Sequence, residues 1–225
     1  FMRDRFGWEG DTLQPAILTI PGLNSSGPDH WQTRWETLRG DCSRVELGDW
    51  DNPRRELWIN RLDGAIRAAG GPIILVAHSL GAVTVAWWAA RFAQPYGWPV
   101  AAALLVAPAD CDRTHNIPSL DDFGPVPREA LPFPSYLVAS RNDPYIRFDR
   151  AHNLGKYWGS QVIDAGECGH INAESGLGDW PLGQKLLDQL IGTAVDQAGL
   201  RRQLRPARAG GVGELVRGAS GVPAR

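Results

Sequence analysis

Apolar residues fall along this chain in short continuous runs that alternate with longer stretches of helical spacing. Four or more consecutive aliphatic residues are typical of a strand buried on both faces of a sheet. Such runs occur at residues 73–76 and 100–107, and further strands are predicted at 16–20, 44–47, 135–139 and 161–164. The pattern therefore predicts a sheet of about six strands.

The stretches between the strands repeat apolar residues every three or four positions, as amphipathic helices do. The first helix follows Asp29, which forms a capping box with Gln32, and Gly40 closes it. The pair Asn52-Pro53 supplies an N-cap and a first-turn proline for the second helix. Further helices are predicted from residue 80 to before Pro95, at 147–157 and from Pro181 onward.

Strands that are joined through helices cannot pair as hairpins, so the sheet is expected to be mostly parallel and doubly wound, an α/β architecture. One domain is predicted at residues 15–197, preceded by a flexible segment at 1–14. Residues 198–225 are rich in Arg and Gly, and we expect a disordered tail there.

Composition narrows the possible partners. The formal net charge of the 225 residues is -2, which favours neither nucleic acid nor a membrane surface as a partner. No apolar run approaches the roughly 20 residues that span a bilayer, and no signal peptide is evident at the start. The three cysteines are widely spaced, which indicates a reducing compartment. A cytoplasmic protein is expected, with no protein partner indicated.

The strongest chemical motif lies between the strand at 73–76 and the helix after it. Ser79 occupies the apex of a strand–turn–helix segment, with the small residues Ala77 and Gly81 two positions to either side. This context is typical of a nucleophile elbow, in which a strained backbone presents the serine hydroxyl. The ring of His78 should support the turn, and the amide of Leu80 should face an oxyanion. The alternative is a serine that merely lies in a loop.

Two further polar residues follow predicted strands at the edge of the sheet where ligands bind. Asp143 comes just after the strand at 135–139, and His170 lies in a Gly-containing loop after the strand at 161–164. The chain order serine, acid, histidine is that of an α/β-hydrolase triad, in which the histidine takes the serine proton and the acid orients it. Asp110 also follows a buried strand and is the competing acid, although Asp112 lies close to it.

A second oxyanion donor is expected in the loop after the first strand. Gly22 allows a close backbone approach there, and the amide of Leu23 is the natural donor. His30 lies at the start of a helix, where it could cap the helix or line the mouth of a pocket. His115 and His152 have no comparable setting.

The segment from Ile20 to Glu36, with its Gly-Pro-Asp-His-Trp-Gln core, resembles small lidless α/β-hydrolases typified by retinoblastoma-binding protein 9, which have bacterial relatives. The resemblance continues through His78–Gly81, Ser140–Pro144 and Gly169–Asn172 and covers roughly residues 15–195. It implies an α/β-hydrolase fold without a large lid, and the same triad. The Leu-x-Cys-x-Glu motif, through which the namesake is supposed to bind a partner, is absent around all three cysteines.

The sequence thus predicts a serine hydrolase that cleaves an ester or amide bond of a small substrate through an acyl-enzyme, with no metal or organic cofactor. Two alternatives stay open. The same triad could serve a peptidase or an acyltransferase, or the fold could be a non-catalytic binding module whose basic tail docks an acidic partner.

Overall fold

The computed structural model describes residues 14–92, 99–113 and 118–203. Its centre is a six-stranded sheet with the strand order β2-β1-β3-β4-β5-β6, in which every neighbouring pair is parallel. The strands are β1 (Ala16–Ile20), β2 (Cys42–Arg44), β3 (Ile73–His78), β4 (Val100–Val106), β5 (Ser135–Ala139) and β6 (Gln161–Asp164). The predicted fold class is confirmed.

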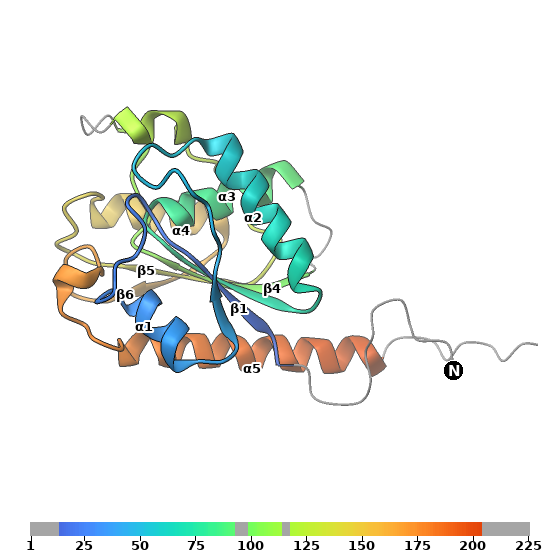
Figure 1. The fold of residues 1–225 in the computed structure, drawn as a ribbon. Coiled ribbons are helices and arrows are strands. Elements are labelled where there is room, and N and C mark those ends of the chain that lie inside the picture. Colours follow the sequence, from blue (N-terminus) through green and yellow to red (C-terminus); the bar gives the residue numbers. More distant parts are fainter. Residues whose placement is uncertain (1–13, 93–98, 114–117, 204–225) are drawn as a thin grey trace, which may run out of the picture.

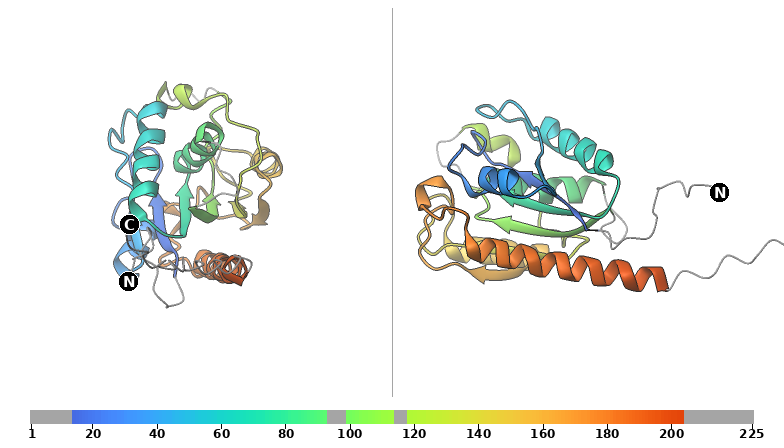
Figure 2. Two further views of the ribbon diagram at one scale, coloured as in Figure 1. Left: turned by 90° about the vertical axis from the view of Figure 1, so that its right-hand side faces the viewer. Right: turned by 60° about the horizontal axis from the view of Figure 1, so that its bottom comes forward.

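Helices cover both faces of this sheet (Figure 1). On one face lie α2 (Arg55–Ala69), α3 (Leu80–Phe92) and α4 (Phe148–Trp158), and on the other lie α1 (Trp31–Leu38) and α5 (Pro181–Gln203). Two short 3-10 helices, η2 (Pro118–Phe123) and η3 (Ala173–Ser175), lie in connecting segments. The right-hand view in Figure 2 shows α5 running lengthwise along the sheet. No large lid domain occurs in the described part of the chain.

The core consists of one hydrophobic layer on each side of the sheet, because alternate residues of a strand point to opposite faces. Leu75 of β3 packs with Leu62 of α2 and Val83 of α3 in one layer. Val76, the next residue of β3, packs in the other layer with Trp35 and Leu187. The continuous apolar runs of the central strands are needed because both of their faces are covered.

The helix ends differ from the predicted caps. The N-cap of α1 is His30 instead of Asp29, and its Nδ1 accepts a hydrogen bond from the amide of Gln32 at 3.2 Å. The helix ends before Gly40, with Arg39 as its C-cap. The capping-box prediction was therefore wrong, because the ring nitrogen of His30, and not the carboxylate of Asp29, accepts the hydrogen bond from the amide of Gln32.

The second helix also begins later than the sequence suggested. The N-cap of α2 is Arg54, so Asn52 and Pro53 lie outside the helix. The carboxylate of Asp122, 67 residues further along the chain, accepts from the amide of Arg55 at 2.7 Å. A side chain far along the sequence thus provides the hydrogen-bond acceptor for an amide in the first turn of α2. Local capping preferences could not have revealed this partner.

One predicted strand lies elsewhere in the structure. Strand β2 spans Cys42–Arg44 rather than residues 44–47, since the pairing with β1 ends at Thr19↔Arg44. Val45 and Leu47 are still buried in the core beyond the strand. Helix α5 runs from Pro181 to Gln203, and no proline follows its first residue until Pro206. The remainder of the predicted tail and residues 1–13 of the predicted N-terminal segment lie outside the described residues.

The order of the strands in the sheet indicates where a ligand site should lie. From β1 the chain moves outward to β2, returns to β3 on the other side of β1, and then continues to β6. In a doubly wound sheet, ligands bind beyond the carboxyl ends of the strands at such a reversal. Here that position lies between the loop after β1 and the turn after β3.

Candidate active site

The turn after β3 has the strained geometry that the sequence pattern predicts. Ser79 has a φ of 54°, a left-handed conformation that non-glycine residues rarely adopt, and its amide donates to the carbonyl of Val106 at 2.9 Å. A Cβ on Gly81 would lie 2.2 Å from the carbonyl oxygen of Ile20. The small residue at this position is therefore required for the close contact between the elbow and β1.

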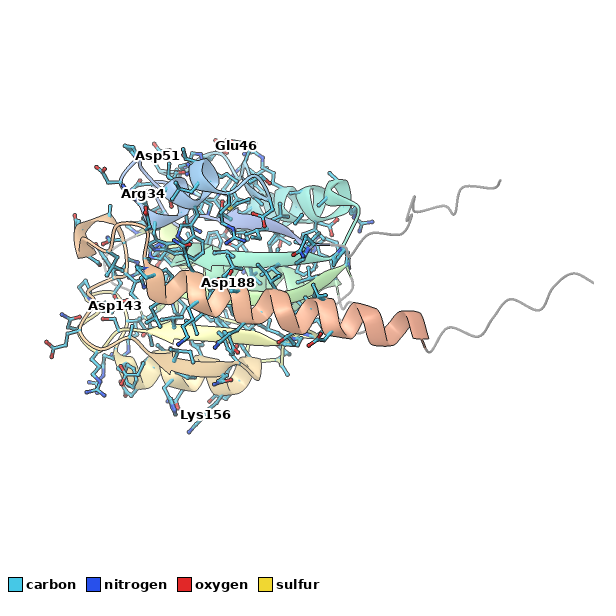
Figure 3. The ribbon with its side chains drawn as sticks, turned by 90° about the horizontal axis from the view of Figure 1, so that it is seen from below. Arg34, Glu46, Asp51, Asp143, Lys156 and Asp188 are labelled. Carbon is cyan, nitrogen blue, oxygen red and sulfur yellow. The ribbon has the colours of Figure 1, made fainter. Side chains whose placement is uncertain are left out.

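The three side chains expected to form a triad lie together. His170 Nε2 is 2.9 Å from Ser79 Oγ, and His170 Nδ1 is 3.0 and 2.9 Å from the two carboxylate oxygens of Asp143. The Asp143 side chain has no exposed surface, and that of His170 is 9% exposed. With a carboxylate at Nδ1, the neutral ring carries its proton there and leaves Nε2 free to accept from the serine hydroxyl. In Figure 3, Asp143 lies among the loops at one end of the molecule, and the C-terminal end of α5 lies at the opposite end.

Asp110, the competing acid, is held elsewhere. Its carboxylate is almost fully buried and binds the guanidinium of Arg150 through two contacts of 3.2 and 2.8 Å. The same guanidinium lies 3.0 Å from Asp112, so the expected repulsion between the two carboxylates is offset by a shared cation. The hydrogen bond to Asp110 also raises the pKa of Arg150. The structure therefore brings Asp143, and not Asp110, to His170.

The loop that presents His170 is fixed by side chains from distant parts of the chain. His78 Nε2 donates to the backbone carbonyl of His170 at 2.9 Å, and Trp31 Nε1 donates to that of Ile171 at 2.8 Å. Since a carbonyl can only accept, the first contact fixes the tautomer of His78. Ile171 has a φ of 50°, so these bonds hold the loop in a conformation that it would not favour alone.

The loop after β5 is joined to the same segment. Asn142 Oδ1 accepts from the amide of Gly169 at 2.7 Å, and Ser140 Oγ accepts from that of Cys168 at 2.9 Å. The sequence pattern included Ser140 and Asn142 only as neighbours of Asp143, and gave them no task. Their side chains tie the loop that carries the acid to the loop that carries the histidine.

Two other histidines, His30 and His78, lie beside the site, and each has a lowered pKa that keeps its ring neutral. Burial lowers the pKa of His78 well below its usual value. Burial, with smaller effects of Arg44 and His170, lowers the pKa of His30 to about 4. The ring centroids of His30 and His78 are 4.8 Å apart, as are those of His78 and His170. His30 therefore both caps α1 and packs beside the base of the turn.

The loop after β1 approaches the elbow closely. A Cβ on Gly22 would lie 2.8 Å from Ser79 Cβ and 3.2 Å from the amide nitrogen of Leu80. Leu23, the next residue, is partly exposed at this edge, and Ala77 is fully buried in β3. The two amides expected to bind an oxyanion thus belong to neighbouring segments beside the serine.

Within the described ranges, no group of three or more His, Cys, Asp or Glu side chains could hold a metal ion. Cys42 and Cys111 are buried, and burial raises the pKa of each thiol to about 12. Among the described residues, none of the helices combines the length and the apolar character that a membrane span requires.

Comparison with known proteins found one family model and several similar solved structures. A family model described as serine hydrolase matches residues 17–189. A YdeN-like hydrolase from Pectobacterium atrosepticum is 31% identical, with a TM-score of 0.71 over 80% of this chain and 92% of that chain.

Two more distant structures resemble this chain in fold. The ydeN gene product of B. subtilis is 16% identical, with a TM-score of 0.62 over 79% of this chain and 99% of that one. Est1E from Butyrivibrio proteoclasticus is 11% identical, with a TM-score of 0.61 over 84% and 90% of the two chains. Among proteins with curated descriptions, none matches.

Proposed function

The chain belongs to the serine hydrolase family, and from this premise we propose that it cleaves a carboxylic ester or amide bond of a small substrate through an acyl-enzyme. The observation that carries the proposal is the continuous set of contacts from Ser79 Oγ through the imidazole of His170 to the carboxylate of Asp143. A serine hydroxyl is a weak nucleophile at neutral pH unless a base takes its proton during attack.

In the proposed reaction, Ser79 Oγ attacks the substrate carbonyl while its proton passes to His170 Nε2. Asp143 holds the ring in the required tautomer and stabilises the imidazolium that forms. The tetrahedral intermediate then collapses, and His170 gives the proton to the leaving oxygen or nitrogen. A water molecule, activated by the same imidazole, hydrolyses the acyl-enzyme and restores the serine.

The amides of Leu80 and Leu23 would stabilise the negative charge that develops on the carbonyl oxygen. The position of Leu80 at the first residue of α3 supports this role, because the amides at a helix N-terminus are unpaired. The closeness of Gly22 to the Leu80 amide supports the contribution of the loop after β1. In this scheme Gly22, Ala77, His78 and Gly81 shape the site and do not react.

The proposed reaction needs no metal and no organic cofactor. Its substrate is a small molecule, and it involves neither nucleic acid nor a membrane. A cytoplasmic location is proposed on the three cysteines, all of which are free. Peptidase or acyltransferase activity would use the same three residues, and a panel of acceptors would reveal either. A binding module without catalysis would need none of the contacts among them.

A covalent probe tests the nucleophile. A fluorophosphonate should label one residue, Ser79, in a stoichiometric manner, and Ser79→Ala should abolish labelling and lower ester turnover by ~10⁴-fold or more. Ser43→Ala is the matched control, since Ser43 is exposed on the edge strand β2. Labelling that persists in Ser79→Ala, or that is lost in Ser43→Ala, would contradict the assignment.

A further inference from the structure

Tyr145 lies directly on the proposed base. Its ring centroid is 4.6 Å from that of His170, with an angle of 65° between the ring planes. Its amide donates to Asp143 Oδ1 at 2.9 Å, so the residue is anchored to the acid as well. Nevertheless its surface is 42% exposed. An aromatic ring is thus fixed against the catalytic groups while much of it faces solvent.

The contact distinguishes Tyr145 from another exposed tyrosine. Tyr157 is 45% exposed on α4, where the guanidinium of Arg128 lies over its ring at 5.4 Å. An exposed aromatic side chain is ordinary on a protein surface. One that packs edge-to-face on the proposed base borders the space where the reaction takes place.

The chemistry shows which part of a substrate would lie there. His170 Nε2 must pass its proton to the leaving atom, so the leaving group has to lie against the imidazole. In the proposed reaction the carbonyl oxygen of the substrate would point toward the amide of Leu80 and the loop that carries Gly22, which lie close together. The exposed ring beside His170 therefore borders the leaving group rather than the oxyanion.

We propose that Tyr145 is a specificity-determining residue that binds an aromatic leaving group, so that arylmethyl esters are preferred over saturated esters of equal size. This inference rests on the proposed function. Aromatic rings attract one another in edge-to-face and offset arrangements beyond the effect of the buried area alone. A saturated ring of the same size gains only the burial.

The test compares benzyl acetate with cyclohexylmethyl acetate, which share the acyl group and differ in the aromaticity of the leaving group. Tyr145→Ala should lower the ratio of kcat/KM for benzyl over cyclohexylmethyl ester about threefold to tenfold, mainly by raising KM for the benzyl ester. Tyr145→Leu, which keeps an apolar side chain, should lower the ratio similarly. Tyr145→Phe should retain it, because the ring remains.

Tyr157→Ala is the matched control and should leave the ratio unchanged. An equal loss for both esters in Tyr145→Ala, or a fall in kcat without a change in the ratio, would overturn the inference and leave the proposed function standing. Turnover of neither ester by an unaltered enzyme whose Ser79 is labelled by the fluorophosphonate would overturn this inference alone, and a failure of that labelling as well would overturn the proposed function. Retention of the ratio in Tyr145→Leu would equally exclude aromatic binding.

Discussion

Three histidines meet near the carboxyl end of β3, and their surroundings give them different chemistry. His78 is buried and neutral, and donates to a carbonyl. His30 is neutral as well, with its Nδ1 occupied by a helix cap. His170 has a carboxylate at one ring nitrogen and a serine hydroxyl at the other. Position in the fold, and not residue type, therefore distinguishes His170, the proposed base, from the other two.

The neutral state of His30 makes stability depend on pH. Its pKa falls from 6.5 to about 4 on folding, so the unfolded chain binds the proton more tightly. The stabilisation is complete above pH 6.5 and is lost as the pH falls through that value toward 4. His78 acts in the same direction.

His30→Asn retains an N-cap acceptor and removes this titration. Between pH 7 and pH 4.5 the free energy of unfolding should fall less in the variant than in the parent, by on the order of 2 kcal/mol. Denaturant unfolding at the two pH values measures the difference. Equal losses in both proteins would show that His30 does not contribute.

The two buried aspartates should separate activity from stability. Asp143→Asn keeps the shape of the side chain but favours the wrong imidazole tautomer, and turnover should fall by up to ~10⁴-fold. Asp110→Asn weakens a buried ion pair with Arg150, so it should lower the melting temperature while turnover changes less than about tenfold. Ester kinetics and thermal unfolding of both variants provide the measurement. The reverse pattern would make Asp110 the acid.

Among the secondary-structure elements, the central strands and the elbow could be predicted, because both depend on nearby residues. Continuous apolar runs identify buried strands, and small residues at fixed offsets identify the turn. The caps of α1 and α2 could not be predicted in the same way. His30 caps α1 although the neighbouring Asp29 has the higher capping preference. The carboxylate of Asp122 accepts from the amide of Arg55, far away in the sequence. Local preferences are weak where tertiary contacts compete with them.

Glycine-to-alanine changes in two neighbouring helices should act in opposite directions. Gly64 lies within α2 with open space around it, so Gly64→Ala should stabilise the protein by ~0.5–1 kcal/mol. Gly81 lies in the first turn of α3 against the backbone of β1, and Gly81→Ala should distort the elbow. Thermal unfolding and phosphonate labelling of the pair test this. Unaltered labelling in Gly81→Ala would contradict the required close contact.

For the molecule as a whole, the order of strands brings distant segments to one edge of the sheet. The sequence predicted that Ser79, Asp143 and His170 would follow three different strands, and parallel strands place such positions together. The supporting contacts of Trp31, Asn142 and Tyr145 were not predictable, because they depend on how loops pack on one another. A residue that only orients a catalytic loop leaves no spacing pattern in the sequence.

Truncation can test whether the C-terminal residues contribute to stability or activity. The described side chains of α5 that enter the core extend to Ala194, and residues 204–225 lack apolar periodicity. Removing 204–225 should therefore shift the melting temperature by no more than about 2 °C and leave ester turnover unchanged. Leu190→Ala, a core position of α5, should cost ~2–5 kcal/mol as the control. A shift above about 5 °C on truncation would show that this segment packs on the domain.

The anchors of the His170 loop have a consequence for when the enzyme becomes active. The bonds that hold this loop join residues 140 and 92 positions apart, and Ser79 is 91 positions from its proposed base. On a ribosome, the nucleophile emerges long before the imidazole that would activate it. A nascent chain would thus hold an inert serine, and hydrolysis would begin only after β6 has joined the sheet.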